Sequence, residues 1–445
     1  MTGDVIIALA TGGSPSGAIA VIRISGEECI KKINQFVSID LLKAKDHSIH
    51  FCNIYDDRRE IIDEVLISVF YKNHSYTKEE SLEISCHNST YIITTIINTL
   101  INHGMRMAAP GEFTRRAFKH GRMDLTQAEA VADIIAAKSK AAHDIALTQI
   151  RGGFSQKIEK IKNTILSVAT QLEIENDFSE EDILQQPRQN IIKTIHGVLN
   201  DVELMLQCFE RGEVIRHGLP VAIVGMPNVG KSSLLNCLLN EERAIVSEIA
   251  GTTRDTIDAE VNIGDIVCRF IDTAGIRSDY IDEIEKAGIE RAKKTIEKAQ
   301  MVLFMIDVTT REDDYKEQLT TIRSYNKDFL IIVNKIDLNP MYKIAEEAIY
   351  ISIKTKNNID SIKEYIANKY NVVANEVFVN ARHLEVFKSI YTALQKTIDA
   401  LEHGMSSEFI MWNINNILLS LDTITGKTTS QDILDNIFSK FCVGK

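Results

Sequence analysis

The sequence has few prolines, no paired cysteines and no long apolar run. Its 445 residues include six prolines and seven cysteines, and no two cysteines form a CxxC pair. An odd number of scattered cysteines argues against a disulfide framework and against a cysteine-based zinc site. No run approaches the roughly 18 apolar residues of a membrane-spanning helix, and the start "MTGDVIIALATGG" has no signal-peptide pattern. We therefore expect a cytoplasmic protein with reduced thiols and no membrane insertion.

The sequence also lacks an excess of positive charge. It has 50 basic and 62 acidic residues, for a formal net charge of -12. Such a chain does not bind nucleic acid indiscriminately, although a local basic patch still can, because binding follows the local potential. The densest basic segment is "TRRAFKHGR" at 114–122. We expect at most weak or partner-dependent contact with nucleic-acid phosphates there.

The hydrophobic pattern changes three times along the chain. Up to about residue 118, β-rich runs such as "AIAVIRIS" and "EVLISVFY" alternate with the helical run "YIITTIINTLINHG". Helical spacing then continues as far as Gly212, a candidate helix end. Next come short apolar strands, typical of a parallel sheet covered on both faces: "PVAIVG", "VCRFID", "MVLFMID", "FLIIVN" and "AIYIS". After residue 373 the spacing is helical again.

These changes predict a multidomain fold, α/β plus all-α. A domain with a mainly parallel sheet lies between two helical segments, which suggests that it is inserted into one helical body. The predicted limits are 1–118 for an N-terminal α/β domain, 119–214 and 374–445 for the two helical segments, and 215–373 for the inserted domain.

A phosphate-binding loop is predicted at the start of the inserted domain. "GMPNVGKS" (225–232) follows a strand and opens a helix, and it fits the pattern G-x-x-x-x-G-K-[ST]. Glycines allow backbone N–H groups to converge on phosphates, and the helix N-terminus adds its dipole. Lys231 is expected to reach the outer phosphates, and Ser232 is expected to bind Mg²⁺.

Four later segments together identify the nucleotide as GTP. "GTTRD" (251–255) supplies a threonine for Mg²⁺, and "DTAG" (272–275) supplies Asp272 and the Gly275 amide. "NKID" (334–337) follows a strand, and Asp337 can accept the N1–H and the 2-amino group of guanine, a pair that adenine lacks. "ISIK" (351–354) fits the last base-contacting loop. The order of these elements predicts a P-loop GTPase domain.

The residue that usually orients the attacking water is missing. Many small GTPases have glutamine after the glycine of "DTAG", whereas this chain has Ile276. An arginine can replace it, with Arg254 and Arg277 as candidates. Alternatively, the Asn228 side chain can hold a monovalent cation against the charge that develops between the phosphates. A carboxylate of the acidic segment after "DTAGIR" can orient the water.

The whole chain resembles the MnmE (TrmE) family of tRNA-modification GTPases. The resemblance depends on "VIRISG", "PGEFTRRAFKHGRMDLTQAEAVADII", "GMPNVGKSSLLN", "AIVSEIAGTTRD", "DTAGIR…EKAGIERA" and "FCVGK". It implies an N-terminal tetrahydrofolate-binding and dimerisation domain, a helical domain in two segments and an inserted G domain.

The resemblance implies that K⁺ and G-domain dimerisation replace an arginine finger. Asn228, Ser247, Ile249 and Thr252 would bind K⁺, and Ser232 and Thr253 would bind Mg²⁺. Glu285 would position the water, although the spacing to it is one residue longer here. The implied catalytic residues are Glu285, Asn228 and Lys231. The implied GTP contacts are Asn228, Val229, Gly230, Lys231, Ser232, Ser233, Ser247, Glu248, Ile249, Ala250, Gly251, Thr252, Thr253, Asp272, Thr273, Ala274, Gly275, Asn334, Lys335, Asp337 and Ser352.

The resemblance also implies the overall reaction. The protein would act as a homodimer with MnmG, a partner that carries FAD, on the wobble uridine of tRNA. It would add a carboxymethylaminomethyl or aminomethyl group at the 5-position, with the one-carbon unit taken from 5,10-methylene- or 5-formyl-tetrahydrofolate. Two alternatives remain: a regulatory or ribosome-assembly GTPase switch, and a dimeric scaffold that binds GTP without modification activity.

The folate contacts implied by the resemblance are Arg23, Glu83, Arg122 and Lys445. The alternative for the charged pair is an ion pair within a half-buried strand. The family usually has a His-Gly-Gly turn after the glutamate, but this chain has "CHNS" (86–89). A positive φ suits Asn88 better than Ser89, so the backbone and the folate affinity can differ here. Cys442 in the tail is either a nucleophile or an inert apolar residue.

Overall fold

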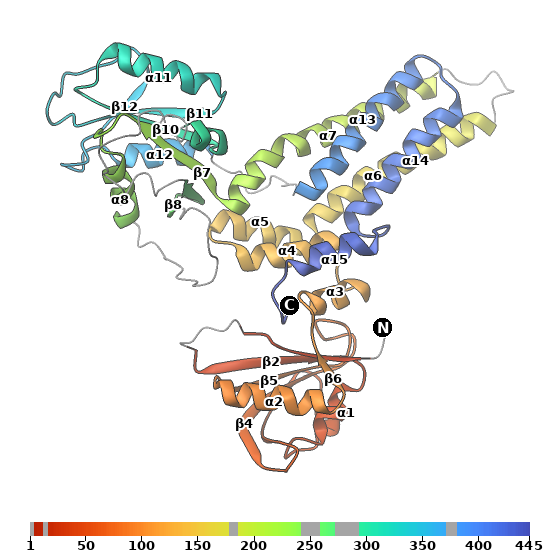
Figure 1. The fold of residues 1–445 in the computed structure, drawn as a ribbon. Helices are drawn as coiled ribbons and strands as arrows, with labels where there is room; N and C mark the ends of the chain where they lie inside the picture. The colour runs from red at the N-terminus through yellow and green to blue at the C-terminus, as the bar shows by residue number, and fades with distance from the viewer. Residues whose placement is uncertain (1–3, 12–16, 178–185, 242–258, 272–292, 371–380) are drawn as a thin grey trace. The chain divides into compact units, whose positions relative to one another are not determined.

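The computed structural model describes most of the chain in two compact units. The first unit comprises 1–132, 148–195 and 393–445, and the second comprises 133–147 and 196–392. Figure 1 shows the elements of each unit. The described residues are 4–11, 17–177, 186–241, 259–271, 293–370 and 381–445.

A six-stranded sheet forms the N-terminal part of the first unit. Its strand order is β3-β4-β5-β2-β1-β6. The β1–β6 pair is parallel and the other pairs are antiparallel. The strands are β1 (Val5–Leu9), β2 (Ile19–Ser25), β3 (Ser48–Tyr55), β4 (Ile61–Phe70), β5 (Ser81–His87) and β6 (Met105–Met107).

One face of this sheet is buried by helices. Along β4, Val65, Ile67 and Val69 are buried while Glu64 and Leu66 are exposed, as the two-residue period of a strand requires. Helix α2 (Thr90–Asn102) turns apolar residues toward the same core, and it lies along the sheet in Figure 1. The short helices are α1 (Cys29–Asn34), the 3-10 turn η1 (Leu41–Lys43) and α3 (Glu112–Lys119).

Long helices occupy both chain segments that were predicted to be helical. Within the first unit α6 packs against α14, where the Lys162 amine meets the Asp422 carboxylate at 2.5 Å. The helices are α4 (Leu125–Ala136), α5 (Lys140–Ile150), α6 (Gly153–Asp177), α7 (Gln186–His217), α13 (Ala381–Glu402), α14 (Ser407–Thr425) and α15 (Gln431–Ser439).

The expectation that a helix ends at Gly212 is wrong. Helix α7 continues through Gly212 to His217, and Gly218 follows with φ +80°. A buried glycine inside a helix costs only about 1 kcal/mol relative to alanine, so a well-packed helix can include it. The left-handed conformation at Gly218 is the usual one after a helix end.

The second unit contains the predicted, mainly parallel sheet. Its strand order is β12-β11-β10-β7-β9-β8, and only the β8–β9 pair is antiparallel. The strands are β7 (Leu219–Gly225), β8 (Ala259–Ile263), β9 (Ile266–Phe270), β10 (Met301–Asp307), β11 (Asp328–Asn334) and β12 (Ala348–Tyr350). The fold class is thus confirmed, whereas the four domain limits stay predictions.

Helices cover both faces of this sheet. The helices are α8 (Lys231–Glu241), α11 (Glu312–Ser324) and α12 (Asp360–Lys369). Leu303 and Met305 of β10 join the core with α8 and α12, and Phe304 joins the core with α11. This two-sided burial explains why the strand sequences are apolar throughout. Among the helices described, none combines the length and the apolarity that a bilayer crossing needs.

Candidate functional site

Three polar loops meet at the carboxyl edge of the parallel sheet. Gly225 ends β7, Asp307 ends β10 and Asn334 ends β11. In register, Gly225 lies opposite Met305, and Asp307 lies opposite Asn334. Ligands of open parallel sheets bind at this edge, where the predicted phosphate and base loops now lie together.

Two glycines of the phosphate loop have no room for a side chain. A Cβ on Gly225 (φ +147°) would lie 2.0 Å from the Met305 carbonyl oxygen, and a Cβ on Gly230 (φ +107°) would lie 2.5 Å from the Asn334 Nδ2. Asn228 is left-handed at φ +63°, which asparagine tolerates better than most residues. The loop therefore wraps tightly over the strand ends, with Asn228 exposed at its turn.

Lys231 folds back across the loop. It is the first residue of α8, and its Nζ donates to the carbonyl oxygens of Gly225 at 3.0 Å and Met226 at 2.7 Å. Burial lowers the pKa of this amine. An anion between the loop and the α8 N-terminus would favour the charged form of Lys231.

Asn334 connects the phosphate loop with the base loop. Its buried amide donates to the Val229 carbonyl at 2.8 Å, and its Oδ1 accepts from the Ile353 N–H at 3.2 Å. Lys335 adds a second connection, because its Nζ donates to the Asn228 carbonyl at 2.8 Å. The two predicted loops are therefore held in fixed relation by "NKID".

Asp337 and Ser352 lie together at the predicted base-binding end of the site. The Ser352 hydroxyl donates to Asp337 Oδ1 at 2.6 Å. Ser352 is buried, whereas Asp337 is exposed. The hydrogen bond from the buried Ser352 therefore orients the Asp337 carboxylate, whose remaining acceptor positions are open to solvent. There it can accept hydrogen bonds from two neighbouring N–H groups.

Asp307 was not among the predicted site residues. Its carboxylate is buried and pairs with Lys335 Nζ at 2.5 Å. Burial raises the pKa of Asp307, but hydrogen bonds from Lys335 and Thr309 outweigh it and hold the pKa below its usual value. The sequence did carry a signal, because an aspartate ends the apolar strand "MVLFMID" at the same sheet edge. Its place indicates that it positions Lys335.

The described residues include one part of the predicted GTP site. Val229 is buried, and Ser232 and Ser233 lie in the first turn of α8. Arg254 and Arg277, the arginine candidates, lie outside the described residues. So do Ser247, Glu248, Ile249, Ala250, Gly251, Thr252, Thr253, Asp272, Thr273, Ala274, Gly275 and Glu285.

Two of the predicted folate residues, Arg23 and Arg122, lie beside one aromatic ring, that of Tyr76. Arg23 on β2 lies opposite Glu83 on β5, and its Nε and Nη2 meet Glu83 Oε1 at 2.9 and 2.8 Å. The Arg23 guanidinium lies 5.5 Å from the Tyr76 ring centre, and the Arg122 guanidinium lies 4.8 Å from it. The carbonyl of Ser75 accepts from Arg122 at 2.7 Å.

The C-terminal tail lies at the same place. Arg23 Nη1 donates to the Gly444 carbonyl at 3.3 Å, and the Phe113 N–H donates to the Lys445 carbonyl at 3.2 Å. Gly444 has φ +94°, and a Cβ there would lie 2.5 Å from the Leu9 carbonyl oxygen. The tail is therefore anchored, and it brings Lys445 near Arg23 and Phe113. Cys442 is exposed.

The "CHNS" segment has an ordinary backbone. Ser89 precedes α2 with φ −100°, and Asn88 is not among the described residues with positive φ. The Asn88 N–H donates to the Ala18 carbonyl at 2.9 Å, and its side-chain amide donates to the Gly17 carbonyl at 2.6 Å. The segment therefore holds the start of β2 without the left-handed turn that a His-Gly-Gly sequence favours.

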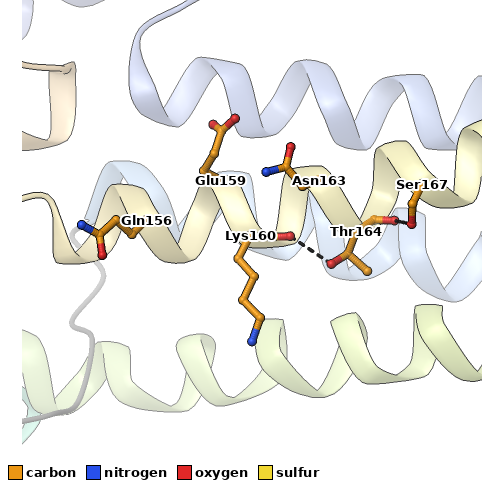
Figure 2. A pocket seen from close by; sticks show the side chains of 6 residues that line it. All are labelled: Gln156, Glu159, Lys160, Asn163, Thr164 and Ser167. Atoms are coloured by element: carbon orange, nitrogen blue, oxygen red, sulfur yellow. Dashed lines mark hydrogen bonds between the residues drawn. The ribbon is translucent and has the colours of Figure 1, made fainter.

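A shallow hollow of about 600 Å³ lies elsewhere, along α6. Figure 2 shows that Glu159 and Asn163 point to one side of the helix and Lys160 to the other. Side chains that diverge from one helix do not form a convergent set of polar groups, which a binding pocket needs. The hollow is lined by Gln156, Glu159, Lys160, Asn163, Thr164 and Ser167.

Comparisons with known proteins show the family to which the chain is similar. The family described as "GTP-binding protein TrmE N-terminus" matches residues 5–122, and "MnmE helical domain" matches 125–442. The "tRNA modification GTPase MnmE" of Flavobacterium johnsoniae is 44% identical over 469 residues, with 99% of each chain covered. The protein of the same name from Cytophaga hutchinsonii is 41% identical, with 99% of this chain and 98% of its own covered.

One solved structure resembles a smaller part of the chain. It is the complex of Era with MgGDPNP and nucleotides of 16S ribosomal RNA, at 31% identity, covering 39% of this chain and 66% of Era. Its TM-score is 0.26, so the overlay adds no argument about function.

Proposed function

Because the chain belongs to the MnmE family of tRNA modification GTPases, we propose that it couples K⁺-dependent GTP hydrolysis to modification of tRNA. With an FAD-containing MnmG-type partner, it adds a carboxymethylaminomethyl or aminomethyl group to the 5-position of the wobble uridine. A tetrahydrofolate, as the 5,10-methylene or 5-formyl form, supplies the one-carbon unit. The proposed substrate, tRNA, puts this reaction in the cytoplasm.

The observation that supports GTP most strongly is the oriented Asp337 carboxylate. Ser352 fixes one oxygen at 2.6 Å, and Asn334 connects this loop with the phosphate loop. The distance between base and phosphates is thereby set by the protein. A nucleotide without two adjacent N–H groups would leave Asp337 without its ligand bonds, which costs affinity.

The phosphate loop is suited to the triphosphate and its cations. The α8 N-terminus and the loop amides can bind phosphate oxygens, and Lys231 can exchange its two carbonyl contacts for them. The Ser232 hydroxyl and the Asn228 amide oxygen are oxygen donors, which Mg²⁺ and K⁺ prefer. Bound there, these cations would supply positive charge against the phosphate oxygens. Ser247, Ile249, Thr252 and Thr253 complete the proposed donor set, with Glu285 to orient water.

The ring of residues around Tyr76 supports a folate site. Both Arg23 bonds end on Glu83 Oε1, so we assign Oε2 to the N–H groups of a pterin. Tyr76 offers a face for stacking. Arg122, and Lys445 at the anchored tail, can meet the carboxylates of the glutamate end. The ordinary backbone of "CHNS" leaves this arrangement intact around Glu83.

An exposed apolar surface on the N-terminal sheet supports homodimerisation. Phe51 on β3 lies directly opposite Leu66 on β4, and their exposed fractions are 65% and 46%. Ile49, on the same side of β3, is 66% exposed. Adjacent exposed apolar side chains on a sheet are typical of a protein interface.

The basic segment 114–122 is a poor independent site for tRNA. Arg115 pairs with Asp435 at 2.7 Å, and Arg116 pairs with Asp4 at 2.7 Å. Arg122 is bonded to the Ser75 carbonyl. These contacts pair much of the segment's positive charge within the protein and leave less of it for phosphates. We therefore propose that tRNA binds together with the MnmG-type partner.

Reconstitution tests this proposal. The chain, an MnmG-type partner, FAD, GTP, a tetrahydrofolate and unmodified tRNA are incubated, and the wobble nucleoside is identified by mass spectrometry. We expect the modified uridine with the wild-type chain and none with Asp337→Asn under GTP. Hydrolysis of GTP without any modified nucleoside would favour the alternative of a regulatory GTPase switch.

A further inference from the structure

We propose that Asp46, His47 and His74 form a binding site for a divalent transition-metal ion, such as Zn²⁺, at the edge of the N-terminal sheet. One ligand atom from each side chain lies within 4.8 Å of the other two. None of these three residues belongs to the predicted nucleotide site or to the predicted folate site.

Both imidazoles face the same carboxylate. His74 Nδ1 lies 2.6 Å from Asp46 Oδ2, and His47 Nδ1 lies 3.1 Å from Asp46 Oδ1. The Tyr71 N–H donates to Oδ1 at 2.9 Å and orients the carboxylate. Two imidazole nitrogens and one carboxylate oxygen are a donor set suited to Zn²⁺ and its neighbours.

The backbone explains how two sequence neighbours can share one ion. In an extended strand, Asp46 and His47 would point to opposite faces. His47 instead has φ +55°, and its N–H donates to the Val69 carbonyl at 2.9 Å. Its ring also packs edge-on against Phe70, with 5.4 Å between ring centres. The left-handed residue thus turns both side chains to the same side.

The spacing of the donors is close to what an ion requires. A tetrahedral ion with bonds of about 2.1 Å holds its ligand atoms about 3.4 Å apart. The two imidazole–carboxylate separations, 2.6 and 3.1 Å, are shorter than that value by less than 1 Å, and all three ligand atoms lie within 4.8 Å of one another. To bind an ion, the imidazole nitrogens would move slightly away from the carboxylate, and both rings are largely exposed, at 56% for His47 and 67% for His74.

The bound ion would connect the start of β3 with the loop after β4. Asp46 and His47 come directly before β3, and His74 lies four residues beyond the end of β4. Three protein ligands leave at least one position for water, because Zn²⁺ takes four ligands. The alternative is a cluster held by hydrogen bonds alone, with an imidazole N–H donating to each carboxylate oxygen.

Titration of the full chain with ZnCl₂ distinguishes a metal site from a cluster held by hydrogen bonds alone. Mg²⁺ and GDP are kept saturating so that the nucleotide site is occupied, and heat release gives the stoichiometry. Because His74 is exposed, His74→Ala is expected to fold normally, which unchanged GDP binding verifies. The matched control is His50→Ala, which removes a histidine on β3 that contacts the Ser48 hydroxyl.

We expect the wild type and His50→Ala to bind one Zn²⁺ more per chain than His74→Ala, or to bind it at least tenfold more tightly. Co²⁺ should give visible absorption bands in the wild type that are lost in His74→Ala and in Asp46→Asn. Equal Zn²⁺ binding by the wild type and His74→Ala would overturn the site. Binding that appears only at millimolar Zn²⁺ would overturn it as well.

Discussion

At the scale of single residues, the proposed preference for guanine depends on one exposed carboxylate, that of Asp337. Replacing Asp337 by asparagine exchanges an acceptor oxygen for an N–H donor at the guanine edge. We expect Asp337→Asn to weaken GTP binding at least a hundredfold, about 3 kcal/mol, and to improve binding of xanthosine triphosphate, which has an oxygen at C2. Displacement of a fluorescent GDP analogue measures both.

Ser352→Ala is expected to weaken GTP binding less than Asp337→Asn does. It removes the 2.6 Å bond to Asp337 but keeps the carboxylate, so we expect a loss of about tenfold or less, near 1 kcal/mol. Unchanged GTP affinity in Asp337→Asn would contradict the assignment of the base loop.

The folate proposal also depends on a single carboxylate. Glu83→Gln keeps the shape of the side chain but removes the charge that pairs with Arg23. We expect tetrahydrofolate binding to weaken at least tenfold, because charge-assisted hydrogen bonds are about twice as strong as neutral ones. Glu64→Gln on the neighbouring strand removes an exposed carboxylate and should leave folate binding unchanged. Equal affinities in both variants, measured by titration calorimetry, would support the structural ion pair instead.

At the scale of elements, a cluster of ion pairs connects β1, β6 and α3. Arg106 and Arg116 both bond to Asp4 and to Glu112. Burial raises the pKa of Glu112, but hydrogen bonds from Arg106, Ala109 and Arg116 outweigh it and lower the pKa to about 2. The folded pKa thus lies below the unfolded value of about 4.3. Its stabilisation is present above pH 4.3 and is lost as the pH falls toward 2.

We therefore expect the free energy of unfolding of the wild type to fall by a few kcal/mol between pH 6 and pH 3, in part through Glu112. Glu112→Gln should be less stable at pH 6 but should lose less between the two values. Urea unfolding at each pH measures the difference. Identical slopes with pH in both proteins would show that Glu112 does not contribute.

The phosphate loop has no space for even one methyl group at Gly225. In Gly225→Ala the new Cβ would need the space of the Met305 carbonyl, at 2.0 Å, so β7 and β10 would have to separate. We expect loss of nucleotide binding and a destabilisation of at least about 3 kcal/mol. Gly197→Ala is the control, because Gly197 lies in α7 with nothing within 4 Å of its Cβ, and it should be neutral or slightly stabilising. Normal GTP binding by Gly225→Ala would contradict the loop geometry.

Apolar runs and glycine-rich loops were the features that the sequence predicted well. "VAIVG" and "MVLFMID" are buried on both faces, so their composition alone indicates parallel strands. The predicted helix end at Gly212 was wrong because a well-packed long helix can include a glycine, and packing cannot be read from one sequence. Asp307 was missed because its role depends on the register that places it beside Asn334.

At the scale of the whole molecule, the assignment of function depends more on the family relationship than on the geometry of the sites. Matches at about 40% identity run through nearly the full chain, and the fold places the phosphate and guanine loops together. The geometry does not bear on the water-orienting group or on most of the proposed K⁺ ligands. The segments with Glu285 and most of those ligands lie outside the described residues. Their roles were expected from the resemblance and stay proposals.

In the proposed mechanism, a cation takes the place of the glutamine and of the arginine finger. The most direct measurement is GTP hydrolysis by the purified chain in matched KCl and NaCl, with Asn228→Ala beside the wild type. We expect strong stimulation by K⁺ in the wild type, at least tenfold, and loss of that stimulation in Asn228→Ala, with GDP binding retained in both. Equal rates in the two salts would contradict the claim and would turn attention to Arg254 and Arg277.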